Sequence, residues 1–252
     1  MSPRWALYDQ LIDSIPGDVI AEDVLLGCSW TLVRSAGVGL ALTPHEGMCS
    51  LSGAGSLRGR TVRDLATLLK SWNPFEAALG AAAANSYWNA PATVDRQWTI
   101  DPAAQTNESV FMAIRTELTG KKVAVVGRFP DLGDLAPLCE LSILERRPQA
   151  ADFPDPACEF ILAEQDYLFV TGTALWNKTL PRLLELGRNA KIVMVGPTVP
   201  LTPTWFGWGI SMLAGTVVLD AERVWRHVAE GGTRSIFTQG ARMVRLDRTD
   251  VR

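Results

Sequence analysis

The chain has 252 residues, of which 47% are hydrophobic and 20% charged, with a formal net charge of −3. These proportions are typical of folded globular proteins and exclude intrinsic disorder and fibrous architectures. No basic block that could neutralise phosphates stands out, so nucleic-acid binding is not expected. The longest apolar run, Ala77 to Ala84, is far shorter than the roughly 20 residues that span a bilayer, so no membrane partner is expected.

Two further features predict a cytoplasmic protein. The N-terminal stretch mixes aspartates with apolar residues and lacks the continuous apolar segment of a signal peptide. The four cysteines are widely spaced with no CxxC pair, a pattern that indicates reduced thiols. They are Cys28, Cys49, Cys139 and Cys158.

The first elements expected are a helix, a small sheet and a second helix. Apolar residues recur at helical spacing over 3–15, which predicts an amphipathic helix. Between 21 and 42, short apolar segments separated by glycine-containing turns predict two or three antiparallel strands. Thr61 and Asp64 then have the spacing of a capping box, which predicts that the second helix begins there.

An Ala-rich segment, 75–89, is apolar nearly all round and predicts a buried helix. Asn85 is the polar exception near its end. A buried amide needs hydrogen-bond partners, so Asn85 either satisfies loop backbone or faces a ligand in a cleft. The residues alone leave both roles open.

The next stretch separates two predicted domains. Residues 91–106 are polar and contain proline, and a short helix is expected over 107–118. The following Thr-Gly-Lys-Lys is a plausible boundary region. We therefore predict an α+β domain over 1–105 and a second domain over 106–252.

In the second half, short apolar segments alternate with helical ones. Strands that are apolar on both faces and joined by helices predict a parallel sheet, so the chain is assigned to the α/β class with a Rossmann-like second domain. A closing hairpin is expected from 235–237 and 243–246. The predicted parallel strands cover 123–127, 141–145, 167–172, 191–196 and 215–219.

In such sheets, ligands bind outside the carboxyl ends of the strands where the strand order reverses. The residues that follow these strands, or the turn after the third, are therefore the candidate ligand contacts. They are Gly127, Arg128, Phe129, Glu145, Thr171, Gly172, Thr173, Asn177, Lys178, Gly196 and Pro197.

Glu145 lies 18 residues after Gly127, close to the roughly 20-residue spacing at which an acidic residue binds a ribose hydroxyl. The full GxGxxG motif is missing, however, which weakens the case for a nucleotide or S-adenosylmethionine-like cofactor. The alternative is a surface ion pair of Glu145 with Arg146 or Arg147.

The turn before Pro181 is a second candidate feature. Thr179 suits the N-cap of the following helix, whose amides and Lys178 would together favour an anion. Simple capping is the alternative. Gly196 and Pro197 could likewise let a ligand approach the backbone or only form a turn.

The residue inventory limits the chemistry. The only histidines are His45 and His227, so a His-rich metal site within one chain is excluded. His45, Glu46 and Cys49 are close in sequence, but the neighbouring proline and glycine favour a surface loop over a metal site. His227 is expected to be solvated near a helix C-terminus. No GxSxG motif supports a serine nucleophile, and no catalytic residue is identified.

Several segments together resemble the putative heavy-metal chelation family. They are GCSWTLVRS, SWNPFEAALGAAAANSYWN, KKVAVVGRFP, LSILERRP and TGTALWNKTLPRLLELGRNAKIVMVGPTVPLTP. The resemblance covers nearly the whole chain and implies an N-terminal domain similar to that of enolase, followed by a Rossmann-like domain. It also implies a ligand site in the cleft between them, with Asn85 joining the candidates named above.

Among these candidates, Glu145 alone is a good metal ligand, and its hard oxygens do not select a soft metal. Cys139 and Cys158 flank the second predicted strand, but nothing in the sequence places both in the cleft. The leading hypothesis is therefore a protein that binds a heavy metal, a metal complex or an anionic small molecule in the cleft. The alternatives are an enzyme that uses a nucleotide or S-adenosylmethionine-like cofactor, and a scaffold without a ligand. The sequence leaves a homodimer open.

Overall fold

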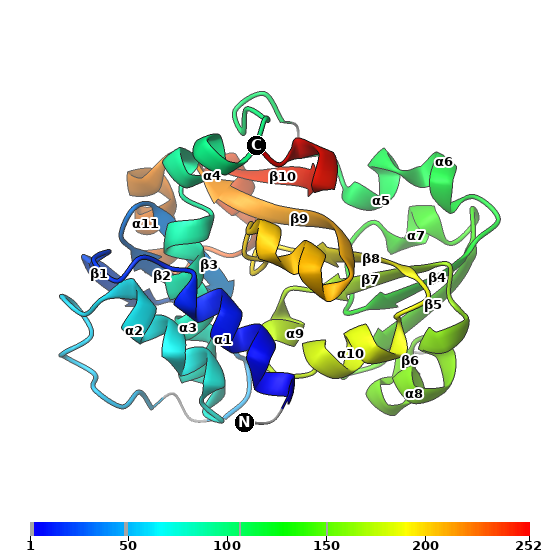
Figure 1. The fold of residues 1–252 in the computed structure, drawn as a ribbon, viewed down its shortest axis with the longest axis horizontal. Helices are drawn as coiled ribbons and strands as arrows, with labels where there is room; N and C mark the ends of the chain where they lie inside the picture. The colour runs from blue at the N-terminus through cyan, green and yellow to red at the C-terminus, as the bar shows by residue number, and fades with distance from the viewer. Residues whose placement is uncertain (1–2, 48–49, 106, 150) are drawn as a thin grey trace.

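The computed structural model describes every residue except 1–2, 48–49, 106 and 150. It contains a three-stranded antiparallel sheet, of order β1-β2-β3, and a seven-stranded sheet (Figure 1). The α/β class predicted from the sequence is therefore confirmed. In the part of the chain described, no helix is both long enough and apolar enough to cross a membrane.

The first half forms the elements expected up to residue 90. The hydroxyl of Thr61 accepts a hydrogen bond from the amide of Asp64 at 3.1 Å, as a helix N-cap does. The helices and strands are α1 (Ala6–Asp13), β1 (Asp23–Leu26), β2 (Trp30–Arg34), β3 (Val38–Leu42), α2 (Val62–Ala66) and α3 (Pro74–Trp88).

Helix α3 is buried on nearly all sides, as its Ala-rich sequence predicts. It contacts β2 and β3 on one side and α2 on another. Small residues permit these close approaches. A Cβ atom on Gly80 would lie 2.3 Å from the amide nitrogen of Leu69, and one on Gly39 would lie 2.0 Å from that of Ser86. The helix is thus packed too tightly for larger side chains at either contact.

The second half supplies the larger sheet and the helices around it. Its elements are α4 (Pro91–Gln97), α5 (Val110–Ala113), α6 (Arg115–Leu118), β4 (Lys122–Val126), α7 (Leu132–Leu135), β5 (Glu140–Glu145), β6 (Phe153–Pro154), α8 (Cys158–Ile161), β7 (Tyr167–Thr171), α9 (Thr173–Trp176), α10 (Leu180–Leu186), β8 (Lys191–Val195), β9 (Ile210–Val218), α11 (Ala221–Ala229) and β10 (Ala241–Asp247).

The strand order of this sheet is β10-β9-β8-β7-β4-β5-β6. Neighbouring strands are parallel except for β10, which runs antiparallel to β9. The chain moves outward from β4 through β5 to β6, and then returns to place β7 on the other side of β4. The strand order therefore reverses between β4 and β7, which in doubly wound sheets marks the ligand-binding edge.

Residues 91–106 include helix α4, which begins at Pro91 in a position that suits the first helical turn. One sequence prediction about local structure is wrong. The expected hairpin does not form, because residues 234–238 adopt a 3-10 helix and β10 pairs with β9. Ile236 is fully buried in a cluster with Trp30 and Val228, so tertiary packing decides the conformation of this apolar segment.

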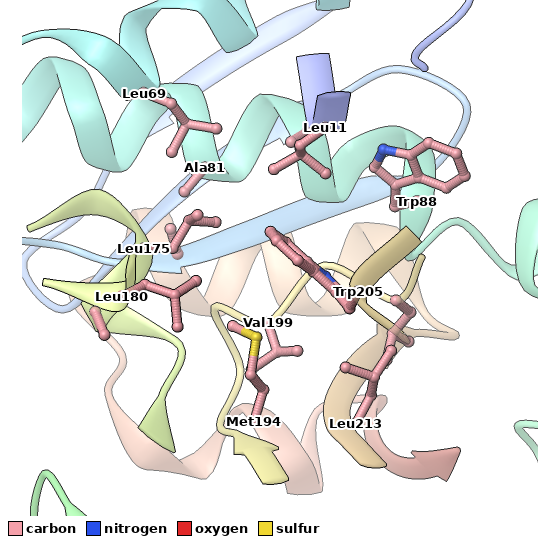
Figure 2. Close-up of a cluster of buried hydrophobic side chains, with 14 of the residues drawn as sticks. Leu11, Leu69, Ala81, Trp88, Leu175, Leu180, Met194, Val199, Trp205 and Leu213 are labelled. Atoms are coloured by element: carbon pink, nitrogen blue, oxygen red, sulfur yellow. The ribbon is translucent and has the colours of Figure 1, made fainter. Parts of the chain in front are cut away.

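The largest hydrophobic core cluster contains residues from both halves of the chain. Figure 2 shows Leu11, Leu69 and Trp88 from the first half in one cluster with Leu175, Met194, Trp205 and Leu213 from the second. The expected boundary between residues 105 and 106 stays a prediction, and the two halves share one apolar interior.

Buried amide side chains also join the halves. The Nδ2 atom of Asn85 donates to the carbonyls of Leu40 (2.8 Å) and Thr198 (3.0 Å). The Nδ2 atom of Asn89 donates to the carbonyls of Val199 (2.9 Å) and Thr216 (3.0 Å). Both asparagines lie near the end of α3, so they hold the loop after β8 against the first half.

Candidate functional site

A cavity of about 750 Å³ lies at the edge where the strand order reverses. Its walls come from the carboxyl ends of β4, β5 and β7, from the loop after β3 and from the segment between α9 and α10. Seven of the predicted contacts line it, namely Gly127, Arg128, Glu145, Thr171, Thr173, Asn177 and Lys178. The structure thus brings together residues from three strand ends, as the sequence argument expected.

The other five candidates lie outside this cavity lining. The ring of Phe129 packs against that of Phe111, with centroids 5.4 Å apart, in a separate apolar cluster. Asn85 is fully buried, and its Nδ2 atom donates to two backbone carbonyls. A Cβ atom on Gly172 would lie 2.8 Å from the amide nitrogen of Val199. Gly196 and Pro197 begin the loop that Asn85 holds.

Gly127 is required for a steric reason within the protein. Its φ is +100°, and a Cβ atom there would lie 2.9 Å from the Cβ of Thr171 on the adjacent strand. The next helix, α7, begins only at Leu132. The helix that follows β4 therefore does not begin at this turn, unlike the helix after the phosphate-binding turn of dinucleotide-binding folds.

Arg128 is neutralised by a neighbouring carboxylate. Its Nη1 lies 2.6 and 2.7 Å from the two carboxylate oxygens of Asp152, whose side chain is only 1% exposed. Because this ion pair balances a buried carboxylate, moving Arg128 toward a ligand would leave Asp152 without its counter-ion, with the amide of Gln149 still donating to it. Its main role in this structure is to balance Asp152.

Glu145 accepts hydrogen bonds from backbone amides. Its Oε1 atom is 2.7 Å from the amide nitrogen of Arg146 and 3.4 Å from that of Arg147. The guanidinium groups of these arginines pair elsewhere, with Asp155 and Glu46 respectively. The suggested surface ion pair of Glu145 with either arginine is therefore wrong, and no ion pair of the described residues includes Glu145.

Lys178 has the most unusual environment in the site. Its φ is +67°, and it is the single non-glycine residue with positive φ in the described chain. Its Nζ donates to the carbonyls of Ser71 and of Trp176 (2.9 Å), and it lies 5.6 Å from the centroid of the Trp72 ring. Burial lowers its pKa to about 8.

The turn around Lys178 is held by Asn177. The Oδ1 atom of Asn177 accepts from the amide of Thr179 at 3.0 Å and from its hydroxyl at 2.7 Å. Thr179 is the N-cap residue of α10, as predicted, but its backbone is already helical and its side chain accepts no capping bond. Asn177 instead forms an Asx turn that fixes the peptide containing Lys178.

Sequence reasoning missed several cavity residues. His45 and Glu46 are exposed, as expected for a loop, yet both line the cavity, and Glu46 reaches Arg147 across it. The neighbouring Cys49 lies outside the described residues. Arg182 and Glu159 also line the cavity and form an ion pair. No local sequence pattern could predict these ion pairs, because their partners are distant in the chain.

The thiols of the described cysteines do not form a metal cage. Cys158 lines the cavity, and burial raises the pKa of its thiol to about 11. Cys139 is outside the cavity lining, with its thiol 3.6 Å from the carbonyl of Leu135. Among the residues that the structure describes, no group of three or more His, Cys, Asp or Glu side chains could hold a metal ion. This donor set does not fit a bare soft metal, which needs several thiolates.

Comparisons with known proteins cover nearly the entire chain. Two family models match it over residues 8–88 and 110–247, and each is described as putative heavy-metal chelation. An uncharacterised protein of Methanocaldococcus jannaschii is 26% identical over 87% of this chain and 86% of its own length.

Two crystal structures of DUF364 proteins of unknown function share the fold. The protein from Pyrococcus horikoshii is 20% identical, with 97% of this chain and 99% of that one covered and a TM-score of 0.78, a likeness of fold alone. The protein from Desulfitobacterium hafniense is 38% identical, with 97% and 98% covered and a TM-score of 0.89. One family model spans more than half of the chain and a solved relative matches nearly all of it, so the chain belongs to the DUF364 family, described as putative heavy-metal chelation.

Proposed function

We propose that the cavity binds a small anionic molecule or a metal complex. The observation that carries this proposal is that two charged residues of the cavity lining are not used in ion pairs of the described residues. Every Arg, Asp and Glu that lines the cavity belongs to an ion pair, with the exception of Glu145. Lys178 lines it too and makes no ion pair among the described residues. These two groups are thus available to a ligand without breaking a salt bridge.

The same walls favour a complex over a naked ion. A metal that arrives with its own donors needs only polar and charged contacts around it, and Lys178 with the hydroxyls of Thr171 and Thr173 can supply them. The family description agrees with a metal-bearing ligand. The free thiols of Cys28, Cys139 and Cys158 support a cytoplasmic location for this activity.

A second candidate is an enzyme that uses a nucleotide or S-adenosylmethionine-like cofactor. It is favoured by the position of Glu145, which ends β5 beside β4 and lines the cavity, where a ribose-binding acid lies in dinucleotide-binding folds. This candidate needs phosphate or carboxylate contacts other than a helix at Gly127, since α7 begins too late to provide one.

The test begins with native mass spectrometry and elemental analysis of the protein as purified. A thermal-shift screen then compares inorganic phosphate, nucleotides, S-adenosylmethionine, divalent metals and citrate–metal complexes. We expect stabilisation by an anion or a metal complex, with affinity about tenfold or more lower in Lys178→Met. Glu145→Gln should weaken the binding of a metal complex but not that of a plain anion, because it removes a negative charge. Lys121→Met, at an exposed lysine outside the cavity, is the control.

Three outcomes separate the candidates. An anion whose affinity falls in Lys178→Met, or a metal complex whose affinity falls in both cavity variants, supports the proposal when Lys121→Met binds it as wild type does. Saturable binding of a nucleotide or S-adenosylmethionine that depends on Glu145 moves the protein to the enzyme class. Stabilisation that is equal in wild type and both cavity variants contradicts a ligand role for this cavity.

A further inference from the structure

We propose that Lys178 is a carbonyl-reactive amine that forms an imine with an aldehyde or ketone bound in the cavity. This inference rests on the proposed function only in requiring that a ligand enters the same cavity. It adds a chemical class to the ligand and a covalent step to the site. Four features of Lys178 carry it: backbone conformation, hydrogen bonding, lack of a carboxylate partner, and position on the cavity wall.

The backbone at Lys178 is held where an L-residue is disfavoured. A left-handed conformation brings Cβ close to the following carbonyl oxygen, so such residues persist only when their surroundings fix them. Here Asn177 fixes the turn through its two bonds to Thr179. Residues with strained backbones are most frequent at functional sites. In the described chain, the single non-glycine residue with positive φ is Lys178, which lines the cavity.

The amine is oriented from the opposite half of the molecule. Its hydrogen bond to the Ser71 carbonyl reaches across 107 positions of the chain. Ser71 is itself fixed, because its hydroxyl donates to Glu76, a carboxylate that is 8% exposed and also accepts from the amide of Ser52 at 2.9 Å. Glu76 is therefore a positioning residue for Lys178.

The hydrogen bonds suit a neutral amine. A neutral Nζ has two N–H bonds and one lone pair, and the carbonyls of Ser71 and Trp176 accept two N–H bonds. Both hydrogen bonds are kept when the ammonium loses its third proton. The lone pair of the neutral amine then takes part in neither bond and is free to attack a carbonyl carbon. The remaining contact of Nζ among the described residues is the face of the Trp72 ring, which attracts the ammonium but offers no proton to the lone pair of the neutral amine.

Electrostatics support the same role. Burial alone lowers the pKa of Lys178 to about 8, with no charged neighbour contributing. At about pH 7.5, the neutral fraction of such an amine exceeds that of an ordinary lysine on the order of a hundredfold. Desolvated lysines of this type are the ones that serve as nucleophiles.

The covalent step balances without an oxidant or reductant. The lone pair of Nζ attacks the carbonyl carbon, a C–N bond forms, and the C–O π bond breaks. One N–H proton passes to the oxygen, which gives a carbinolamine. The hydroxyl then leaves with the second N–H proton as water, and a C=N bond remains.

The experiment measures selective trapping on the intact protein. The chain has five lysines, and the adducts can be mapped on each. Glyoxylate and, separately, pyridoxal 5′-phosphate are added at about pH 7.5 with sodium cyanoborohydride, followed by digestion and mass spectrometry. We expect Lys178 to be modified about tenfold or more faster than the exposed Lys121, given its larger neutral fraction. The advantage should vanish in protein unfolded by urea.

Lys178→Arg is the matched variant, because it keeps the positive charge and cannot form an imine. Its circular dichroism is compared with that of wild type to verify folding. Loss of the selective adduct in Lys178→Arg, with Lys121 still modified at its slow rate, supports the proposal. Modification of Lys178 no faster than Lys121 in folded wild type overturns it. Retained binding of an anion without a selective adduct overturns the imine alone and leaves the proposed function standing.

Discussion

Single residues in this site serve purposes that their identities alone do not reveal. Gly127 was recognised from its place after a strand, and the structure gives it a steric role against Thr171. Lys178 was recognised as a charge before a helix, and the structure gives it a strained backbone and a desolvated amine. Both residues follow strand ends or turns, where backbone conformation and function are decided together.

Replacing Gly127 by alanine should destabilise the protein by about 2 to 4 kcal/mol, because positive φ and overpacking both disfavour a Cβ atom there. Gly133→Ala is the matched control, since its φ is ordinary and a Cβ atom would meet nothing within 4 Å. Urea unfolding of both variants measures the difference. Equal stabilities would show that the Thr171 contact relaxes freely.

The lowered pKa of Lys178 predicts a pH-dependent stability. Between about pH 8 and its ordinary value of 10.5, the unfolded lysine binds more protons than the folded one. The free energy of unfolding contributed by Lys178 therefore rises with pH through this window, and the penalty for burying the charge is complete below it. Lys178→Met should abolish this rise.

The measurement is the difference in unfolding free energy between wild type and Lys178→Met at several pH values. The difference is needed because the raised pKa of Cys158 acts oppositely, so its contribution is lost as pH rises from 9 to about 11. Lys121→Met controls for removal of one positive charge. A difference that does not change with pH would contradict a desolvated amine at Lys178.

At the scale of elements, the sequence predicted the helices whose start or burial can be recognised from neighbouring residues alone. Thr61 and Asp64 marked a helix start, and the Ala-rich segment marked a buried helix, because capping and apolar content are both visible in sequence. The hairpin predicted from 235–237 does not form, because a short segment with two apolar residues, Ile236 and Phe237, fits a strand or a buried turn equally well. Its contacts with distant residues such as Trp30 decide between them.

We predict that the asparagine side chains at the end of α3 stabilise the packing of the two halves of the chain. Asn89→Ala removes the donor to two buried carbonyls and the acceptor for the amide of Leu201. We expect a loss of about 2 to 4 kcal/mol in unfolding free energy, since buried backbone groups would lose their partners. Tyr8→Phe, which loses one bond to the carbonyl of Leu175, should lose about 1 kcal/mol. Similar values for both variants would contradict this account.

The packing of the two halves of the chain explains why part of the site could not be predicted from the sequence. The strand-end residues could be predicted because a parallel sheet places its carboxyl ends at one edge. The approach of Glu46 to Arg147, and of Lys178 to Ser71, depends on how the two halves pack. That packing follows from core side chains scattered through the sequence, which no local spacing identifies.

The shared core predicts a single cooperative unfolding transition. Side chains from both halves, such as Trp88 and Trp205, belong to one buried cluster, so opening either half exposes apolar surface of the other. Urea unfolding followed by tryptophan fluorescence and by circular dichroism should give coincident curves. Fragments 1–105 and 106–252 should each fail to fold alone. Glu46→Gln should leave the single transition intact with its midpoint almost unchanged, because exposed ion pairs contribute little to stability. Two separate transitions would mean that the halves are independent folding units and that the cavity walls can move apart without unfolding either one.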